Sequence, residues 1–315
     1  MVARPTRILF IRFSSIGDIL LTAPAVASLR TAVHGPCEIH YLTKRAFQST
    51  VEGLGDLVDK IHTIEHGTGE VTEALRAEQL DYIIDLHNNV RSRAVKRTLG
   101  LISFTVNKQN WAKWLLVRGW RNAPVEHIVH RYIGSFSEAF NAQLPTHWPP
   151  LFPDAQAPVG LPETYVVLAI GAAHQRKALS DALVDAIFER EQRPVVFIGG
   201  PEDVTRAQTL HERHPEAIQL TGQTDLAGSA AVLRGAAHAY AGDTGMMHLA
   251  AAVGTPVTSF WGCTRPSLGM APWLPAPGSE LIVPLEEPHR PCSKLGNRCR
   301  HQPPCMGQLQ FPVSD

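Results

Sequence analysis

The sequence predicts an α/β protein built from two Rossmann-like domains, each with a parallel sheet. Apolar strand candidates alternate with helical stretches, as parallel strands joined by crossover helices require. The alternation stops in a proline-rich stretch near the middle of the chain and then begins again. A length of 315 residues is sufficient for two such domains.

The composition is that of a soluble globular chain. Hydrophobic residues make up 44% and charged residues 18% of the sequence. Lys plus Arg and Asp plus Glu number 29 each, so no overall field recruits nucleic acid, and any anionic ligand must be held locally. The apolar run near the N-terminus is too short for a signal peptide, and nothing approaches the ~18 apolar residues of a membrane span. With five cysteines, these features favour the cytoplasm.

The first predicted domain, residues 1–150, opens with a strand, a glycine-containing turn and a helix. RILFIRF at 7–13 is the strand, residues 14–18 form the turn, and ILLTAPAVASLRTAV is the helix. This order opens a Rossmann-like unit, whose first turn lies at the ligand-binding edge. Further strands are expected at 37–42, 60–64, 82–86 and 102–106, with helices at 46–54, 70–78 and 127–140. The strand at 82–86 leads into the polar cluster DLHNN.

Residues 108–122 mix tryptophans with basic side chains. They are Trp111, Trp114 and Trp120 with Lys108, Lys113, Arg118 and Arg121. The segment is either a surface that touches lipid headgroups or a glycolipid, because tryptophan prefers half-wet positions, or a helix whose tryptophans pack inward. Inward packing is favoured because no broad apolar face separates from a polar one.

A linker at 151–162 separates the two domains, because repeated prolines resist both helix and strand. The second domain, 163–285, is expected to have strands at 165–170, 194–198, 218–220, 237–240 and 257–261. Helices are expected at 180–189, 202–213 and 224–234. Two Rossmann-like domains joined in this way are expected to form a cleft lined by their strand ends.

The stretch 241–258, AGDTGMMHLAAAVGTPVT, is the strongest candidate for a ligand-binding turn. Small residues lead into a predicted helix at Met246–Val253, and the free N–H groups at its start favour a phosphate. Asp243 can accept hydrogen bonds from a sugar hydroxyl, and His248 is expected to face the same mouth. The alternative is an ordinary helix cap with a half-buried core histidine.

Four motifs together resemble the heptosyltransferase family, glycosyltransferase family 9. They are FSSIGDILLTAPAVASLR at 13–30, IIDLHNNVRS at 83–92, FIGGPED at 197–203 and GDTGMMHLAAAVGTPVTSFWG at 242–262. The resemblance implies a glycosyltransferase B fold, with an acceptor domain first and a nucleotide-sugar domain second. It also implies transfer of a heptose from ADP-heptose to a lipopolysaccharide inner-core acceptor, with inversion at the anomeric carbon and without a metal.

The resemblance assigns roles to individual residues. Asp18 matches the catalytic base, and a carboxylate at the cleft can take the proton of the acceptor hydroxyl. The alternative is an aspartate that caps the helix beside the Gly17 turn. The donor contacts would be Asp243, Thr244, Gly245 and His248, with Gly199 and Gly200 in the third motif. Gly17, Asn88 and Arg91 would line the acceptor cleft, although Asn88 and Arg91 also fit solvated loop positions.

One departure from the family pattern concerns the phosphate-binding cation. The family usually has a proline-glycine turn and a basic residue before a Trp-Pro pair, and residues 170–178, IGAAHQRKA, have neither the proline nor Trp-Pro. Arg176 or Lys177 would replace the cation, because positive charge must offset the charge that builds on ADP.

The tail at 286–315 concentrates metal-ligating residues, namely Cys292, Cys299, His301 and Cys305. Their density is compatible with a structural tetrahedral zinc site, but the spacing misses the usual CxxC pattern. Reduced surface thiols are therefore the favoured interpretation. The tail is also expected to pack back on the N-terminal domain.

The sequence leaves several functions open. The expected partners are an ADP-sugar donor and a lipopolysaccharide core or other saccharide acceptor, with peripheral contact at the inner membrane surface. The same fold could use another nucleotide sugar or a protein acceptor, or serve as a noncatalytic sugar-nucleotide-binding subunit. A dehydrogenase is disfavoured because no GxGxxG motif follows a strand.

Overall fold

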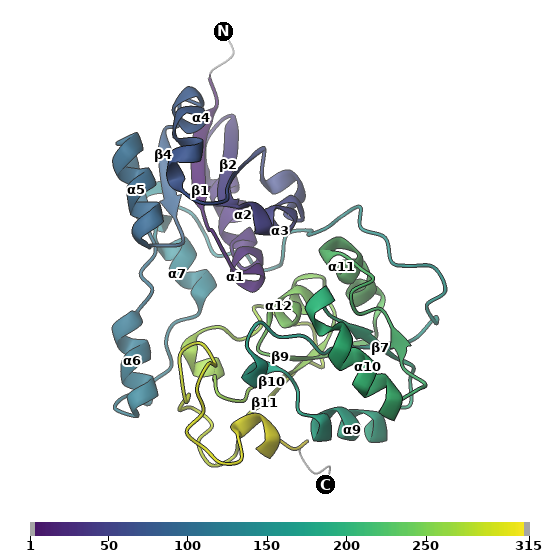
Figure 1. The fold of residues 1–315 in the computed structure, drawn as a ribbon. Coiled ribbons are helices and arrows are strands. Elements are labelled where there is room, and N and C mark those ends of the chain that lie inside the picture. Colours follow the sequence, from purple (N-terminus) through teal and green to yellow (C-terminus); the bar gives the residue numbers. More distant parts are fainter. Residues whose placement is uncertain (1–3, 312–315) are drawn as a thin grey trace. The chain divides into compact units, whose positions relative to one another are not determined.

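The computed structural model describes residues 4–311, which form two compact units (Figure 1). The first unit comprises the chain up to Lys108 and the segment His127–Pro153. The second comprises Gln109–Glu126 and the chain from Asp154 onward. The main boundary lies close to the predicted linker, but residues 109–126 group with the second unit rather than the first. Between residues 4 and 311, no helix is long and apolar enough to cross a membrane.

The first unit is built on a five-stranded parallel sheet with the order β3-β2-β1-β4-β5. Its strands are β1 (Thr6–Ile11), β2 (Cys37–Lys44), β3 (Lys60–Ile64), β4 (Tyr82–Asp85) and β5 (Ile102–Thr105). All lie close to their predicted ranges. Because the strand order reverses direction at β1 and β4, the carboxyl ends of these two strands flank the switch point where α/β proteins bind ligands.

Seven helices belong to this unit within the described chain. They are α1 (Ile16–Leu20), α2 (Ala23–Ala32), α3 (Gln48–Glu52), α4 (Thr72–Ala77), α5 (Val90–Leu99), α7 (Ile128–Gly134) and α8 (Ser137–Phe140). The single helix predicted after the first turn is divided, because Pro24 lacks the N–H that would continue α1 and instead suits the first turn of α2. The predicted helix at 127–140 is likewise divided into α7 and α8.

The second unit contains a six-stranded parallel sheet with the order β11-β10-β9-β6-β7-β8. Its strands are β6 (Val166–Ala169), β7 (Val195–Ile198), β8 (Ile218–Gln219), β9 (His238–Gly242), β10 (Val257–Phe260) and β11 (Glu280–Ile282). The short edge strand β11 was not predicted, because three residues with an exposed Leu281 give too brief a pattern. The switch point of this sheet lies between β6 and β9.

Five helices complete the second unit within residues 4–311. They are α6 (Asn110–Arg118), α9 (Asp181–Arg190), α10 (Val204–Arg213), α11 (Leu226–Gly235) and α12 (Gly245–Ala252). Two begin at side-chain caps, since Ser180 accepts from the Leu183 N–H and Asp225 accepts from the Gly228 N–H. The inner strands of both sheets are mostly buried, as expected when helices cover a parallel sheet, whereas the edge strands β5, β8 and β11 are more exposed.

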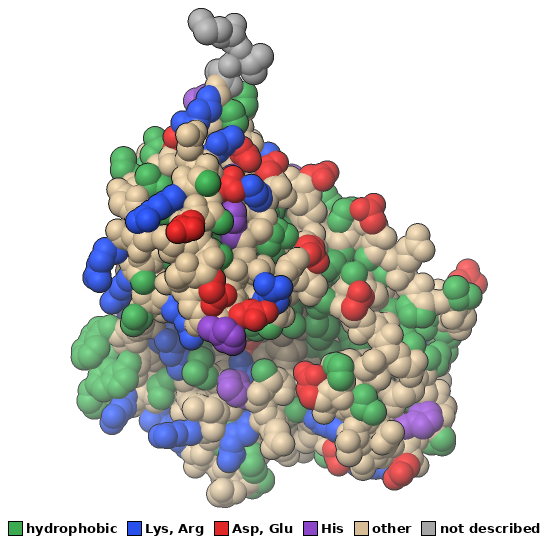
Figure 2. All heavy atoms as spheres, turned by 45° about the horizontal axis from the view of Figure 1, so that its top comes forward, with side chains coloured by type: hydrophobic (Ala, Val, Ile, Leu, Met, Phe, Trp, Pro, Cys, Tyr) green, Lys and Arg blue, Asp and Glu red, His purple; other side chains and the backbone are tan. Residues whose placement is uncertain are grey.

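The tryptophans of helix α6 and of the turn that follows it are exposed, although they were expected to pack inward. Trp111 is 70% exposed, Trp120 69% and Trp114 37%. The inward prediction was wrong because this short helix has only a narrow buried face, formed by Lys113 and by Leu116, which packs with Val125 and Leu268. Figure 2 shows a hydrophobic patch beside lysine and arginine side chains over this helix.

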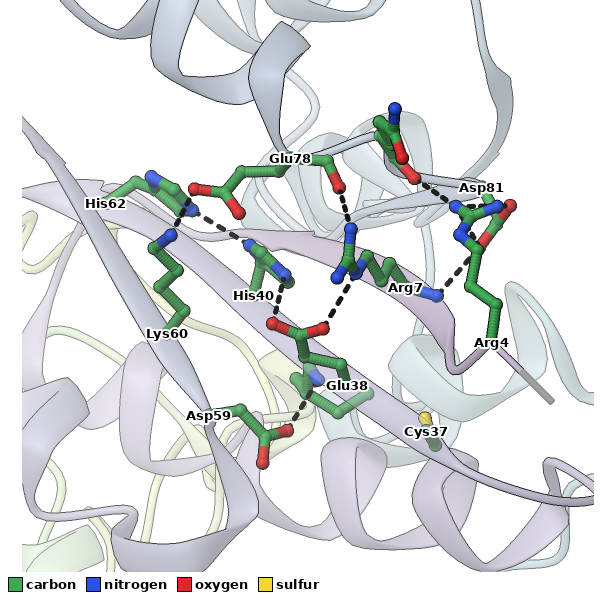
Figure 3. Close-up of polar contacts among 12 residues, drawn as sticks. Arg4, Arg7, Cys37, Glu38, His40, Asp59, Lys60, His62, Glu78 and Asp81 are labelled. Atoms are coloured by element: carbon green, nitrogen blue, oxygen red, sulfur yellow. Dashed lines mark hydrogen bonds and ion pairs between the residues drawn. The ribbon is translucent and has the colours of Figure 1, made fainter. Parts of the chain in front are cut away.

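A buried polar network lies at the amino-terminal edge of the first sheet (Figure 3). His40 Nδ1 is 3.0 Å from His62 Nε2, and His40 Nε2 is 3.3 Å from a Glu38 oxygen. Arg7 Nε donates to the other oxygen of Glu38 at 2.7 Å. Burial and the neighbouring His40 lower the pKa of His62 to about 4, and burial also lowers the pKa of His40. Both imidazoles are therefore neutral at neutral pH.

Acidification is expected to destabilise the first unit through His62. Its folded-state pKa of about 4 lies below the ordinary 6.5, so the unfolded chain binds a proton that the folded chain rejects. The resulting stability is intact above the unfolded pKa and is lost as pH falls toward the folded pKa, by about 2 kcal/mol at about pH 5. Urea unfolding at neutral pH and at about pH 5 measures this loss of stability. In His62→Gln, the loss between the two pH values should be about 2 kcal/mol smaller than in the unmodified protein.

His66→Gln is the control, because the His66 side chain is 92% exposed. If both variants lost stability with pH as the unmodified protein does, His62 would not be the titrating group.

Candidate functional site

The loop between β9 and α12 lies at the switch point of the second sheet. Asp243 is only 7% exposed, and Thr244 occupies the cap position with an extended backbone. The Thr244 side chain does not cap the helix, and its Oγ1 has no hydrogen-bond partner in the described part of the chain. The first N–H groups of α12 are thus not closed by a side-chain cap, and Gly245 begins the helix without a side chain. An anion can use these donors.

Lys177 is the cation that reaches this turn. Its Nζ lies 2.7 Å from Asp243 Oδ2, with the two side chains 20% and 9% exposed. Lys177 ends a short 3₁₀ turn after β6, and β6 pairs directly with β9, so both loops leave the same edge of the sheet. Arg176 is exposed and forms no ion pair among residues 4–311. Of the two cations that the sequence left open, the structure brings Lys177 to Asp243.

Gly242 allows this close approach. A Cβ at this position would collide with the backbone carbonyl oxygen of Lys177. The absence of a side chain at Gly242 therefore makes room for the chain's own loop. His248, one turn into α12, is 3% exposed, which favours a packing role. Its contact with a donor stays a prediction.

The Gly199–Gly200 turn follows β7 and accommodates carboxylates of the same unit. A Cβ at Gly199 would lie 2.9 Å from Asp203 Oδ2, and one at Gly200 would collide with the Glu202 side chain. The Gly200 N–H donates to Asp203 Oδ2 at 2.9 Å. Burial raises the pKa of Asp203. Glycine is therefore needed at both positions to make room for the Asp203 and Glu202 side chains. The contact of these glycines with a ligand stays a prediction.

In the first unit, Asp18 is fixed by Arg12. Asp18 Oδ1 lies 2.7 Å from Arg12 Nη2, and Ser15 Oγ donates to Asp18 Oδ2 at 2.9 Å. Burial opposes the charge on Arg12, but the Asp18 carboxylate together with Tyr132 and Tyr41 outweighs it, so the pKa of Arg12 is raised. Asp18 also completes a capping box with Ser15 at the start of α1, where Gly17 is buried. The capping role and a catalytic role are therefore compatible, since Asp18 keeps 24% exposure.

Asp85 shapes the loop that follows β4. It is fully buried, and its Oδ1 accepts the N–H groups of His87 at 3.0 Å and Asn88 at 2.7 Å. Asn88 has a positive φ of 46°, and its side-chain amide donates to the Val106 carbonyl at 3.0 Å. Arg91 is exposed in the first turn of α5. The Asn88 amide thus holds the loop together, whereas Arg91 is open to solvent.

Sequence reasoning assigned no role to Arg12 or to His87, although His87 belongs to the polar cluster that it placed after the fourth strand. The Phe13 N–H donates to His87 Nδ1 at 3.3 Å. Burial, Arg12 and Lys108 lower the pKa of His87 to about 3, so its imidazole is neutral, and with Nδ1 accepting, its Nε2 carries the proton. Both residues directly follow strands at the switch point. That position was the signal that could have identified them.

Two clusters among the described residues have side chains that could hold a metal. His40, His62 and Glu78 lie at the amino-terminal edge of the first sheet, where Lys60 pairs with the Glu78 carboxylate (Figure 3). This edge is opposite to the switch-point edge, so the cluster is no part of the site above.

The second cluster joins the tail cysteines to Cys263, which follows β10. The prediction of surface thiols was wrong, because Cys292 is 6% and Cys305 1% exposed. His301 lies with its Nε2 3.2 Å from a Glu287 oxygen. The cysteines form a buried group of sulfur atoms that is compatible with a structural metal.

Comparisons with known proteins agree with this architecture. The family model of Glycosyltransferase family 9 (heptosyltransferase) matches residues 69–301. Lipopolysaccharide heptosyltransferase 1 of Pseudomonas aeruginosa is 26% identical over 324 residues, covering 94% of this chain and 88% of that protein. Lipopolysaccharide heptosyltransferase 1 of Escherichia coli K12 is 23% identical over 288 residues, covering 83% of this chain and 89% of that protein.

Solved structures share the fold. The crystal structure of a family 9 glycosyl transferase from Veillonella parvula matches with a TM-score of 0.71 at 20% identity, covering 89% of this chain and 86% of that chain. E. coli heptosyltransferase WaaC with ADP matches with a TM-score of 0.66 at 21% identity, covering 92% and 96%. The two parallel sheets are those of the glycosyltransferase B fold. Because the family match spans well over half of the sequence, this chain belongs to glycosyltransferase family 9, the heptosyltransferase family, and is a glycosyltransferase.

Proposed function

We propose that this chain transfers a heptose from ADP-heptose to a lipopolysaccharide inner-core acceptor, with inversion at the anomeric carbon. The observation that carries the proposal is the Lys177–Asp243 pair beside the uncapped start of α12. Support comes from the family, from relatives named lipopolysaccharide heptosyltransferase 1, and from the E. coli heptosyltransferase solved with ADP.

The second unit would bind the donor. Its diphosphate would accept from the N–H groups at Thr244 and Gly245 and draw the Lys177 ammonium away from Asp243, which then accepts from a donor hydroxyl. As the bond between the anomeric carbon and ADP breaks, negative charge grows on ADP, and Lys177 with the helix dipole stabilises it. The proposed step therefore needs no metal at the diphosphate. Gly199, Gly200 and His248 complete the proposed donor set, and Arg176, which is exposed, is the alternative cation that Lys177 replaces.

The first unit would bind the acceptor and supply the base. Asp18 takes the proton of the acceptor hydroxyl while that oxygen attacks the anomeric carbon on the face opposite ADP. Arg12 holds one oxygen of the carboxylate and fixes its orientation. The neutral His87 would present its Nε2–H to an acceptor oxygen. Gly17 and Asn88 would shape the acceptor pocket, and the exposed Arg91 would meet an anionic group of the acceptor.

We also propose that α6 touches the cytoplasmic membrane surface, where a lipid-linked acceptor would be presented. Trp111 and Trp120 are exposed, and the Arg118 guanidinium lies 5.2 Å from the Trp114 ring centre. Tryptophan rings with neighbouring cations suit the interface between apolar lipid and anionic headgroups.

Lys177→Met is expected to weaken ADP binding about 10- to 100-fold, because a charge-assisted contact to phosphate is lost while the aliphatic stem remains. Arg176→Met is the matched control and should change the affinity less than about threefold, since an exposed cation contributes little. Calorimetric titration with ADP, UDP and GDP measures both effects. Preference for UDP or GDP would reject ADP-heptose as the donor, and equal losses in the two variants would reject the assignment of Lys177.

Asp18→Asn is expected to lower kcat by about 10²- to 10⁴-fold, because the amide cannot take the acceptor proton. ADP affinity should remain within about twofold, since the donor contacts lie in the other unit. The measurement is heptose transfer to a lipopolysaccharide core acceptor, with the exposed Asp56→Asn as the control. An Asp18→Asn variant as active as the unmodified enzyme would place the base elsewhere. Saturable ADP binding without transfer by the unmodified chain would favour a noncatalytic subunit.

Replacing both Trp111 and Trp120 with alanine is expected to reduce binding to vesicles containing anionic phospholipid by about fivefold or more. Leu285→Ala is the control, because Leu285 is a 95% exposed apolar side chain outside α6. Vesicle co-sedimentation measures the binding. Unchanged binding by the double variant would show that α6 is not the membrane contact.

A further inference from the structure

Three cysteine sulfur atoms of the tail lie at the spacing of a metal tetrahedron, and the sulfur of Cys263 lies beside them. Cys292 Sγ is 3.5 Å from Cys305 Sγ and 3.9 Å from Cys299 Sγ, and Cys299 Sγ is 3.5 Å from Cys305 Sγ. The sulfur of Cys263 lies within 4.8 Å of those of Cys299 and Cys305. A tetrahedral ion with metal–sulfur bonds of about 2.3 Å places its sulfurs about 3.8 Å apart. The four thiols are free, so the distances reflect no disulfide.

We propose that Cys263, Cys292, Cys299 and Cys305 bind one tetrahedral metal ion, zinc or iron. Four thiolates in this geometry select these metals over hard cations. Cys263 follows β10, whereas the other three lie in the tail, so the ion would join the tail to the carboxyl edge of the second sheet. The sequence pattern could not show this, because Cys263 is distant in the chain from the tail cysteines.

The backbone around these cysteines supports the site. The N–H groups of Cys292 and Ser293 donate to the Cys263 carbonyl at 2.8 and 3.2 Å, which holds the two chain segments together. The Cys305 N–H donates to Cys299 Sγ at 3.3 Å. Backbone donors of this kind stabilise the thiolate form of a ligating cysteine.

A buried arginine supplies an independent argument. Arg265 is fully buried, contacts the Cys305 side chain, and donates to the carbonyls of Thr264 and Glu287 at 2.9 Å each. Its Nη2 has no hydrogen-bond partner, and it forms no ion pair with a carboxylate, within residues 4–311. A buried cation without an anion is costly. A divalent ion with four thiolates carries a net charge of −2, which would supply the missing anion and be neutralised in part by this guanidinium.

The proposed site also bears on the donor turn, and this part rests on the proposed function. Between Cys292 and Cys299, Ser293 Oγ accepts the N–H groups of Gly296 at 3.0 Å and Arg298 at 3.4 Å. Gly296 has a φ of +76°, and a Cβ there would lie 2.9 Å from Lys177 Cγ. The turn between two metal ligands thus packs against the stem of the lysine that reaches Asp243. The metal would hold this turn and thereby position Lys177.

The ligand set differs from the one predicted from sequence, which contained His301 in place of Cys263. The ligand atoms of Cys292, His301 and Cys305 also lie within 4.8 Å of one another, so His301 is the competing ligand. Its Nε2 faces Glu287 at 3.2 Å. We assign His301 to the surroundings of the site and Cys263 to the metal.

The first test uses the unmodified chain, purified without chelators and with zinc or iron supplied. Elemental analysis should find about one metal ion per chain, and X-ray absorption at the metal edge should show four sulfur atoms at about 2.3 Å. A shell of three sulfurs and one nitrogen would overturn the assignment of Cys263. Metal below about 0.2 ions per chain after reconstitution would overturn the site itself. Neither result requires a variant to fold.

Variants give the second test. Cys263→Ser should lower the metal content at least about fivefold, because one of four ligands is removed. Cys37→Ser, which changes the remaining cysteine of the chain in the first unit, is the matched control and should retain the metal, as should His301→Ala. Retention by Cys263→Ser together with loss by His301→Ala would overturn the proposed ligand set.

The third test measures ADP affinity with and without the metal, in the unmodified chain and in Lys177→Met. Metal depletion should weaken ADP binding about tenfold in the unmodified chain and change it little in Lys177→Met, because the two changes act through one contact. If metal depletion weakened ADP binding equally in both proteins, the metal would not position Lys177. The metal site itself would still be supported by the measured metal content. No ADP binding by the metal-loaded chain would instead reject the proposed donor, independently of the metal measurements.

Discussion

The ion pair between Lys177 and Asp243 connects the parts of the second unit that matter for its chemistry. It joins the loops after β6 and β9, the two strands at the switch point, and it depends on Gly242 because any side chain there would strike the Lys177 backbone. The aliphatic part of the same lysine packs against Gly296 in the tail. A ligand that draws the ammonium toward phosphate therefore acts on a contact shared by two loops and the tail.

The first unit uses a similar device with different residues. Arg12 follows β1 and holds Asp18 at the head of α1, so a cation again fixes a carboxylate beside a switch point. The chemical purposes differ. Asp18 remains partly exposed and can meet an incoming hydroxyl, whereas Asp243 is almost buried and leaves its lysine as the more accessible partner. In the proposed function, the two ion pairs would supply a base in the first unit and phosphate-binding charge in the second.

The sequence was sufficient for the parallel sheets, because buried strands between helices leave a strong periodic pattern. It also predicted where Asp18 and Asp243 lie, at the head of α1 and in the turn before α12, whereas their roles stay predictions. It could not separate Arg176 from Lys177, since adjacent residues differ only in the direction that the folded loop gives them. Arg12 and His87 were given no role because their contacts, with Asp18 and with the Phe13 N–H respectively, form only in the folded chain. Cys263 was missed because its partners lie in a different stretch of the chain, and the tryptophans of α6 were misjudged because nine residues give little amphipathic pattern.

The discontinuous second unit has a consequence for synthesis and for dissection of the protein. Helix α6 is made before the linker, yet Leu116 and Val125 pack with Leu268, and the Val125 N–H donates to the Ser267 carbonyl at 2.8 Å. A growing chain must therefore carry α6 unpartnered on the ribosome until the segment around Leu268 emerges. A fragment that begins at Asp154 would lack this helix and leave Leu268 without its cover, so the second unit is not a contiguous, separable domain.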